Sequence, residues 1–547
     1  MGAGAIAVSP SRRPPWLLIT LALLTSLVMA VPIGYLVYYA LSMTDDVEPL
    51  WSGPMRIRWW NTLLLMAAVT TTVAGLGIVA SWLTVRTNLW GRRLLAVLLV
   101  CPLAVPPYVT AYSLLGLGGD DGLLVRLLGA DSSLLRFWFV DAQTGRFHVP
   151  RLGGYLGSWL ALSAYNFPYV YLPLRAAWHA IDASQEEAAS SLGRSRAAVA
   201  VWVVGPQLLP ALLAGMLLVA LHVMADFGVV SLMRYETLST TLYARYNSFD
   251  TGNAARLALV MISFALLLLM GEWLLLKRLR LDRAGVGTAR IARRTDLGIW
   301  QFPALFTCCL VVVMGVILPV VTTGYWMSTL SDPTIWTSIR KALWGSVVAS
   351  LPAAVGASIL AIPIALLSVR YPGRLTAIFE RAPLVGYSVP ALALGLSFIM
   401  LCLAPWMPEL IFETFYQSLP LLVLAYILHF LAEAVGPIRS SLRLTSPRLE
   451  EAAWSLGASP WGAVFRVTLP IMRHGILVAA AFVFLSCMKE LPLTILLAPV
   501  GMETLARNAW DHAENAEFAR AAPYALITLC ASAGFVGLLL FERRHES

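Results

Sequence analysis

The sequence predicts an all-α integral membrane protein with twelve transmembrane helices, arranged as two homologous halves of six helices each. Three observations lead to this fold class. Of the 547 residues, 59% are hydrophobic and only 13% are charged, whereas a soluble globular protein carries about 25% charged residues. Twelve uncharged runs divide the chain, and most reach the roughly 20 residues that a spanning helix needs. A sequence pattern also recurs at a fixed offset of 264 residues, which indicates two copies of one ancestral half.

The twelve uncharged runs are interpreted as twelve spanning helices. The first, 14–44, is longer than the about 7–15 apolar residues of a signal-peptide core, so it predicts a retained helix. The runs at 257–271 and 474–488 are short, and they reach spanning length only if a flanking charge such as Glu272 or Lys489 lies at or inside the membrane edge. In chain order the runs are 14–44, 59–85, 94–119, 152–174, 197–225, 257–271, 297–331, 342–369, 382–408, 414–432, 474–488 and 521–541.

The distribution of lysine and arginine predicts that both termini lie in the cytoplasm. With the N-terminus inside, the cytoplasmic segments hold 25 of the 39 basic and 12 of the 30 acidic residues, a net charge of +13. The external segments then carry −4, so the basic excess lies inside, as the positive-inside rule requires. We therefore expect a multi-pass protein of the bacterial cytoplasmic (inner) membrane. Because the membrane topology accounts for the basic excess behind the overall charge of +9, we expect no nucleic-acid partner.

The predicted halves are residues 1–276 and 300–547, and a basic cytoplasmic linker at 277–299 joins them. Each half contains six of the twelve runs. Seven lysine and arginine residues lie between Lys277 and Arg294. We interpret this segment as a solvated charge run that touches lipid headgroups.

The two halves differ by an insertion in the first. The dipeptide Val105-Pro106 matches Val389-Pro390 at an offset of 284 rather than 264, so the first half carries 20 extra residues after this point. They fall at 120–154, on the predicted outer side, where alternating polar and apolar residues at 146–149 favour a small hairpin. The insertion is either a contact surface for an external binding protein or an inert cap over the helices.

The repeated pattern is densest in a loop between the fourth and fifth runs of each half. Residues 186–193 read EEAASSLG and residues 450–457 read EEAAWSLG, and an aliphatic residue and a proline follow at the same spacing in both copies. This long, gapless pattern resembles the EAA loop of binding-protein-dependent ABC importer permeases. The motif residues are Glu187, Ala188, Ala189, Gly193 and Pro206 in loop 181–206, and Glu451, Ala452, Ala453, Gly457 and Pro470 in loop 445–470.

The resemblance implies a type I ABC importer permease fold, together with a cytoplasmic ABC ATPase dimer and an extracytoplasmic solute-binding protein as partners. In such a protein Glu187 and Glu451 pair with a basic group on the ATPase. The residue types at the other motif positions agree with this role. Alanines let a partner approach the backbone closely, a glycine permits the positive-φ turn that ends a helix, and a proline suits the first turn of the next helix. The alternative is an interfacial amphipathic helix without a partner.

A second aligned feature lies at the far end of the fifth run of each half. The 264 offset pairs Asp226 with Glu490, and Lys489 directly precedes Glu490. A carboxylate in hydrocarbon is costly and by default indicates a transport pathway, but helix capping or an interhelical hydrogen bond also explains it. The segments DFGVVS with a following ETLSTTLY, and KELPLTILL with a following ETLA, resemble the two halves of fused ferric-iron permeases. Thiamine permeases, which are also fused twelve-helix proteins, are the alternative substrate class.

Other functional classes find little support in the sequence. None of the three lysines follows a GxxxxG segment, so the chain has no Walker A phosphate loop, and ATP would be used by the partner subunit. No HExxH or GxSxG motif indicates an enzyme. The six cysteines and the isolated His222 and His429 indicate neither a metal nor a cofactor. The leading hypothesis is therefore the permease subunit of an ABC importer, with ferric iron as the preferred substrate. Its rival, a secondary transporter, is disfavoured by the twin EAA loops.

Overall fold

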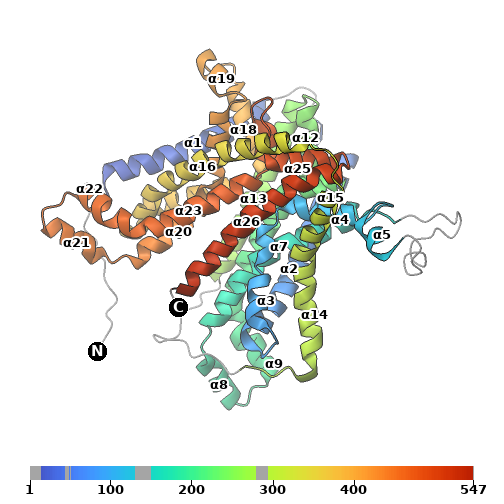
Figure 1. The fold of residues 1–547 in the computed structure, drawn as a ribbon. Coiled ribbons are helices and arrows are strands. Elements are labelled where there is room, and N and C mark those ends of the chain that lie inside the picture. The colour runs from blue at the N-terminus through green and yellow to red at the C-terminus, as the bar shows by residue number, and fades with distance from the viewer. Residues whose placement is uncertain (1–13, 43–47, 50, 130–148, 279–293, 546–547) are drawn as a thin grey trace. The chain divides into compact units, whose positions relative to one another are not determined.

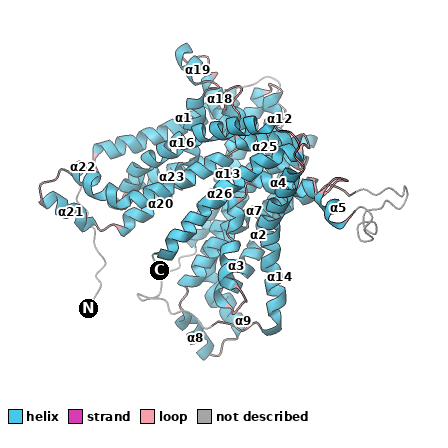
Figure 2. Cartoon of the chain, viewed as in Figure 1, coloured by secondary structure: helices cyan, strands magenta, loops and turns pink. Residues whose placement is uncertain are grey.

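The computed structural model of this chain describes residues 14–42, 48–49, 51–129, 149–278 and 294–545. Helices account for nearly all of this part of the chain (Figures 1 and 2). The described residues contain no β-strand, and a single bridge pairs Thr87 with Thr295. The predicted all-α class is therefore confirmed.

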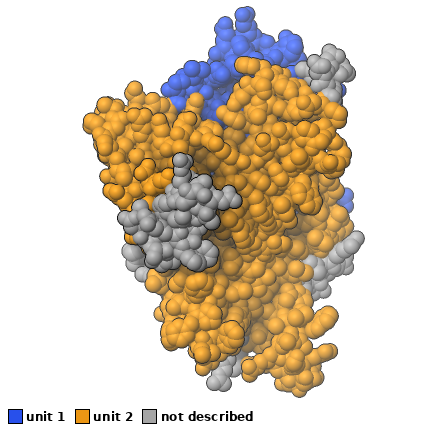
Figure 3. Space-filling view, turned by 90° about the vertical axis from the view of Figure 1, so that its right-hand side faces the viewer, with its two compact units in different colours: residues 1–42, 344–502 blue, residues 43–343, 503–547 orange. Residues whose placement is uncertain are grey.

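The chain forms two compact units that do not follow the two sequence halves (Figure 3). The first unit joins residues 1–42 to residues 344–502, and the second joins 43–343 to 503–547. The N-terminal helix thus packs with helices of the second half, for example with α17 and α18, and the last helix packs with α15 and α4. The halves and the linker at 277–299 stay a prediction from the repeat, and 279–293 lie outside the described residues.

The helices divide between the two units. The first unit contains α1 (Trp16–Ser42), most of α16 (Ile335–Arg370), α17 (Arg374–Ser388), α18 (Ala391–Cys402), α19 (Glu409–Phe415), α20 (Leu419–Leu444), α21 (Pro447–Ser455), α22 (Pro460–Ala463), the π-helical turn η5 (Val464–Thr468), α23 (Leu469–Lys489) and α24 (Pro492–Leu497). The second unit contains α2 (Gly53–Arg86), α3 (Arg92–Leu98), the 3₁₀ turn η1 (Cys101–Ala104), α4 (Pro107–Leu117), α5 (Leu123–Leu128), α7 (Gly154–Ala180), α8 (Ala183–Ser191), α9 (Arg196–Val199), the π-helical turn η2 (Ala200–Val204), α10 (Gly205–Ala225), α11 (Gly228–Leu232), α12 (Leu238–Asn247), α13 (Thr251–Arg278), the 3₁₀ turn η3 (Gly298–Trp300), α14 (Gln301–Val312), the π-helical turn η4 (Val313–Ile317), α15 (Leu318–Ser328), α25 (Leu505–Glu514) and α26 (Phe518–His545).

Eight helices of the described part are long and apolar enough to cross a membrane, and the number rises to ten if two bent pairs each count as one span. All of them coincide with predicted runs. The two remaining runs, 152–174 and 521–541, are also helical, as α7 and α26. Several apolar helices therefore make this a multi-pass membrane protein, while the count of twelve spans stays a prediction.

The two short runs form longer helices than their uncharged cores. Helix α13 continues through Glu272, and the span that ends with α23 begins at Trp461 and includes Lys489. The flanking charges are thus part of the helices, which gives both runs a spanning length. The energetic reason is that a helix end near the interface can keep a charged head in a polar environment.

Both bent pairs break at the valine–proline dipeptides that match between the halves. The axis turns by 95° between α3 with η1 and α4, and by 100° between α17 and α18. Proline disfavours the helical region for the residue before it, and accordingly Val105 (ψ 120°) and Val389 (ψ 127°) are extended. The runs at 94–119 and 382–408 were expected as single spanning helices, and the structure corrects this: each run is a pair of helical segments that meet at a sharp bend.

Helix α7 lies at the centre of the second unit, where α2 and α10 approach it closely. A Cβ atom added to Gly77 on α2 would lie 2.8 Å from Val170, and one added to Gly215 on α10 would lie 2.9 Å from the same residue. Small residues at helix crossings allow such backbone approach in membranes. Because α7 is covered by neighbours, its buried positions include Ser158 and Asn166 as well as apolar side chains.

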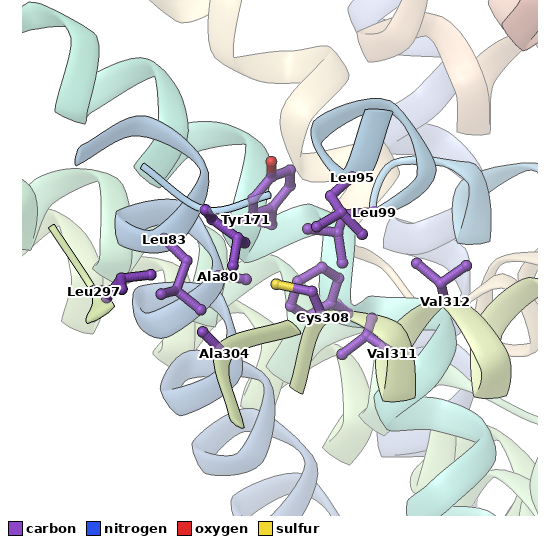
Figure 4. Packing of buried hydrophobic residues seen from close by; sticks show 12 residues of the cluster. Ala80, Leu83, Leu95, Leu99, Tyr171, Leu297, Ala304, Cys308, Val311 and Val312 are labelled. Carbon is purple, nitrogen blue, oxygen red and sulfur yellow. The ribbon is translucent and has the colours of Figure 1, made fainter. Parts of the chain in front are cut away.

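A hydrophobic cluster joins α2, α3 and α7 to α14, which comes from the second sequence half (Figure 4). Its members include Leu83, Leu99, Tyr171 and Cys308, all buried. The Tyr171 hydroxyl forms a buried hydrogen bond of 3.1 Å with Thr84. Cys308 therefore acts as an apolar packing residue here, and this cluster holds α14 against the first-half helices.

The insertion at 120–154 is described only at its ends. Helix α5 follows Gly122, and the Gly119 amide donates a hydrogen bond of 2.8 Å to the Val149 carbonyl. Residues 130–148 lie outside the described part of the chain, so the expected hairpin at 146–149 falls almost wholly there.

Candidate functional site

The two EAA loops contain matching short helices, α8 and α21, which we call the loop helices. Each begins at a side-chain cap: Asp182 accepts from the Ser184 amide at 3.0 Å, and Ser446 accepts from the Arg448 amide at 3.4 Å. Such caps satisfy amides that a helix start leaves without partners. The two loop helices therefore have equivalent first turns.

Each loop helix ends at the motif glycine in a left-handed turn. Gly193 has φ +81° and Gly457 has φ +85°. The amide that follows each glycine donates back to the carbonyl of the second motif alanine, Ala189 at 3.2 Å or Ala453 at 3.0 Å. This bond and the glycine's own amide bond form a Schellman motif. Glycine adopts this backbone conformation without the Cβ penalty, so the motif glycine sets where each helix stops.

One face of each loop helix is exposed. On α8 the exposed residues include Glu187, Ala188 and Ser191, followed by Leu192, which is 85% exposed. On α21 the equivalent residues are exposed, and they are Glu451, Ala452, Ser455 and Leu456 (89%). Positions i, i+1, i+4 and i+5 share one side of a helix. Both loops thus present the same carboxylate, small residue, hydroxyl and leucine outward.

The other glutamate of each motif points inward and pairs with an arginine. Glu186 lies 2.8 Å from Arg86, the last residue of α2, and Glu450 lies 3.0 Å from Arg370, the last residue of α16. These four residues were not singled out from the sequence. The signals that could have found them were the doubled glutamate and the offset of 284 between the two arginines, which is the offset of the Val-Pro pairs.

The inward contacts differ in strength between the halves. In the second half Arg370 also donates to the Thr445 carbonyl at 3.0 Å, and the Thr468 hydroxyl donates to Glu450 at 3.1 Å. The side chains of Arg370 and Glu450 are only 11% and 10% exposed.

In the first half Glu186 is more exposed, at 28%. The Arg86 guanidinium lies over the Trp178 ring, 5.2 Å from its centroid. A separate hydrogen bond of 2.9 Å, from Gln207 to Gln185, ties α8 to α10. The second-half loop is therefore held by the more buried and more fully hydrogen-bonded pair.

The motif prolines lie just beyond π-helical turns. Pro206 and Pro470 stand in the first turn of α10 and α23, directly after η2 and η5, inside spans that begin at Arg196 and Trp461. Proline has no amide to complete an α-helical bond to the fourth residue before it. In each half the residue before the proline closes the widened turn: the Gly205 amide donates to the Ala200 carbonyl, and the Leu469 amide donates to the Val464 carbonyl. The turn η4 precedes Pro319 in the same way.

Asp226 and Glu490 both cap the short helix that follows them. Asp226 Oδ1 accepts from the Val229 and Val230 amides at 3.0 and 3.3 Å, and Glu490 Oε1 accepts from the Leu493 amide at 3.2 Å. Both carboxylates thus act as helix caps in the structure, as one of the two sequence-based interpretations expects. They lie in different units, and a role on the transport path stays a prediction.

A further intramembrane carboxylate, Glu433, was not singled out from the sequence. It lies on α20, and its Oε2 accepts a hydrogen bond of 2.6 Å from Ser486 on α23. Lys489 follows three residues after Ser486, on the same side of α23. The signal in the sequence was that Glu433 is the charge that ends the run at 414–432. No group of three His, Cys, Asp or Glu residues suited to a metal is found among the described residues.

Comparison with known proteins gives a family for both halves. Residues 73–276 and 357–544 each match the family described as binding-protein-dependent transport system inner membrane component. The Fe(3+)-transport system permease protein FbpB 2 of Haemophilus influenzae is 29% identical over 94% of this chain and 96% of its own length. A probable ABC transporter permease protein, y4fN of Sinorhizobium fredii, is 26% identical over 92% of this chain and 90% of its own.

A shorter relative matches part of the chain. The molybdenum transport system permease protein ModB of Escherichia coli is 31% identical over 41% of this chain and 96% of its own length. A protein of this size thus corresponds to less than half of the present chain, in agreement with two copies of the domain. The chain belongs to the family of binding-protein-dependent transport system inner membrane components and carries the family's domain twice in one polypeptide.

Proposed function

We propose that this chain is the membrane-spanning permease subunit of an ABC importer for ferric iron. The observation that carries the proposal is the pair of loop helices with the same outward face, Glu187 to Leu192 and Glu451 to Leu456. An exposed leucine beside a carboxylate suits an apolar groove with a basic rim on a partner protein. Two such helices in one chain require two partner sites, which a dimer of cytoplasmic ATPases supplies.

The choice of iron rests on the full-length similarity to a permease named for Fe(3+) transport, which covers both halves. Relatives named for molybdenum and sulfate transport match at most about half of the chain. Thiamine remains the alternative substrate. The chain itself has no phosphate-binding loop, so we infer that it hydrolyses no ATP and that the ATPase supplies the work.

In the proposed topology twelve helices cross the bacterial inner membrane, both termini are cytoplasmic, and the loop helices face the ATPase. The spans that follow the two loops then carry Asp226 and Glu490 at their outer ends. We place these carboxylates and Lys489 on the substrate path, where a cation released by the external solute-binding protein would meet them. The capping bonds hold both carboxylates at the starts of α11 and α24, so the backbone of these short helices sets their positions.

Transport by the reconstituted complex tests this function. The permease, the ATPase and the solute-binding protein encoded beside it are placed in liposomes, and uptake of radioactive ferric iron is followed with and without ATP. We expect uptake that requires ATP and the binding protein together. Uptake driven by an ion gradient without ATP would make the protein a secondary transporter. ATP-driven uptake of thiamine, molybdate or sulfate in place of iron would move the assignment to that substrate.

A further inference from the structure

We propose that the ion pairs Arg86–Glu186 and Arg370–Glu450 connect the loop helices mechanically to α2 and α16, and that the second-half pair is the stiffer connection. We call them the anchor pairs. The proposal rests on the proposed function in one respect, because it assumes that the loop helices receive movement from an ATPase. The ion pairs themselves are contacts within this chain and do not depend on the proposed function.

Each anchor pair connects its loop helix to a third long helix, in addition to the two that flank the loop in the chain. Covalent continuity already links α8 to α7 on one side and to the span containing α10 on the other. The anchor pair joins α8 to the end of α2, which itself packs along α7 and α10. A displacement of the loop helix therefore acts on three long helices at one end, and in the second half α16 takes the place of α2.

The two adjacent glutamates of each motif have opposite directions. Glu187 and Glu451 are exposed, whereas Glu450 is buried and Glu186 is mostly covered. Consecutive positions of a helix point about 100° apart, so one residue can face a partner while its neighbour faces the membrane-spanning helices. A short helix capped at both ends moves as one piece, and force applied on the outward glutamate reaches the inward one.

Burial distinguishes the anchor pairs from loose surface ion pairs, and the second-half pair is also hydrogen-bonded, from Arg370 to Glu450 at 3.1 Å. An exposed ion pair contributes little and rearranges easily, but removing one partner of a buried pair leaves an uncompensated charge. The pair of Arg370 and Glu450 is buried in this sense, and two further hydrogen bonds hold it, from Arg370 to Thr445 and from Thr468 to Glu450. The pair of Arg86 and Glu186 is less buried, because the Glu186 side chain is partly exposed to solvent. The second-half connection is therefore the one that a substitution affects more.

The test measures coupling and loop rigidity separately. Glu450→Gln keeps the side-chain shape, Arg370→Met removes the charge from the other partner, and Glu186→Gln is the first-half counterpart. Glu413→Gln on the exposed helix α19 is the matched control. In the reconstituted complex we expect Glu450→Gln and Arg370→Met to retain ATPase association but to lower iron transported per ATP by at least about tenfold. We expect less than about fivefold for Glu186→Gln.

Hydrogen exchange on the full permease without partners gives the second readout. Amides 451–458 should exchange at least about tenfold faster in Glu450→Gln than in the wild type, and those of the control should not change. The double exchange Arg370→Glu with Glu450→Arg should recover part of the coupling, which a general packing defect would not allow. Wild-type coupling and wild-type exchange in both Glu450→Gln and Arg370→Met would overturn the proposal. If the wild-type complex imports no iron, the proposed function fails while the exchange experiment still decides the anchor pairs.

Discussion

Substituting Gly457 by alanine, asparagine or tryptophan separates the backbone role of the motif glycine from its contact with a partner. The φ angle of +85° is the left-handed conformation, which costs an ordinary residue about 1–2 kcal/mol. An added Cβ atom meets nothing within 4 Å in this chain, so no internal clash adds to that cost. The turn of an alanine variant should therefore be about 5 to 30 times less populated relative to its open form.

Asparagine and tryptophan give different expected results. Asparagine tolerates the left-handed region better than alanine does, so Gly457→Asn should stay closer to the wild type than Gly457→Ala. Tryptophan carries the backbone cost and also projects a large ring beside the exposed Leu456, where the partner would bind. Gly457→Trp should therefore lose ATPase association most strongly while inserting into the membrane normally.

The assay is capture of the ATPase by membranes that contain a measured amount of inserted permease, followed by ATP-driven iron uptake. The same substitutions at Gly193 repeat the experiment in the first half, because Gly193 has a φ angle of +81° and an added Cβ atom there also meets nothing within 4 Å. Equal defects in Gly457→Ala and Gly457→Asn would refute the backbone argument. Intact transport after both loops are disrupted together would refute the coupling role of the loops altogether.

Three other predictions address the outward glutamates, the substrate path and the topology. Glu187→Gln and Glu451→Gln should weaken ATPase association, measured by the same capture assay, and unchanged capture in the double variant would contradict the partner contact. Asp226→Asn with Glu490→Gln should slow iron uptake at unchanged membrane abundance and basal ATP hydrolysis. Asparagine caps helices about as well as aspartate, so wild-type uptake in this double variant would leave the carboxylates with a structural role alone. Reporter fusions after Asp46, Ala289 and Arg544 should read outside, inside and inside, and an outside reading at Ala289 would contradict the proposed topology.

Much of the loop structure was predictable because it depends on neighbours in the chain. Glycine adopts a positive φ angle at lower cost than other residues, so a glycine after a short helix predicts a left-handed turn there. The structure has this turn at Gly193 and Gly457. The breaks at Val105 and Val389 are equally local, since proline acts on the residue before it. These dipeptides match between the halves, yet a single spanning helix was expected from each run, because an unbroken apolar run does not reveal a bend.

By itself, the sequence determined the all-α membrane class, the doubled domain and the position of the two motif loops, because composition, periodicity and spacing are properties of the chain. Only the tertiary structure decided that the N-terminal helix packs with second-half helices and that the last helix packs with first-half ones. It also decided which glutamate of each motif faces inward, and that Asp226 and Glu490 cap the helices that follow them. The physical reason is that a side chain's partner depends on where distant helices end: Arg86 and Glu186 stand 100 residues apart in sequence and 2.8 Å apart in space.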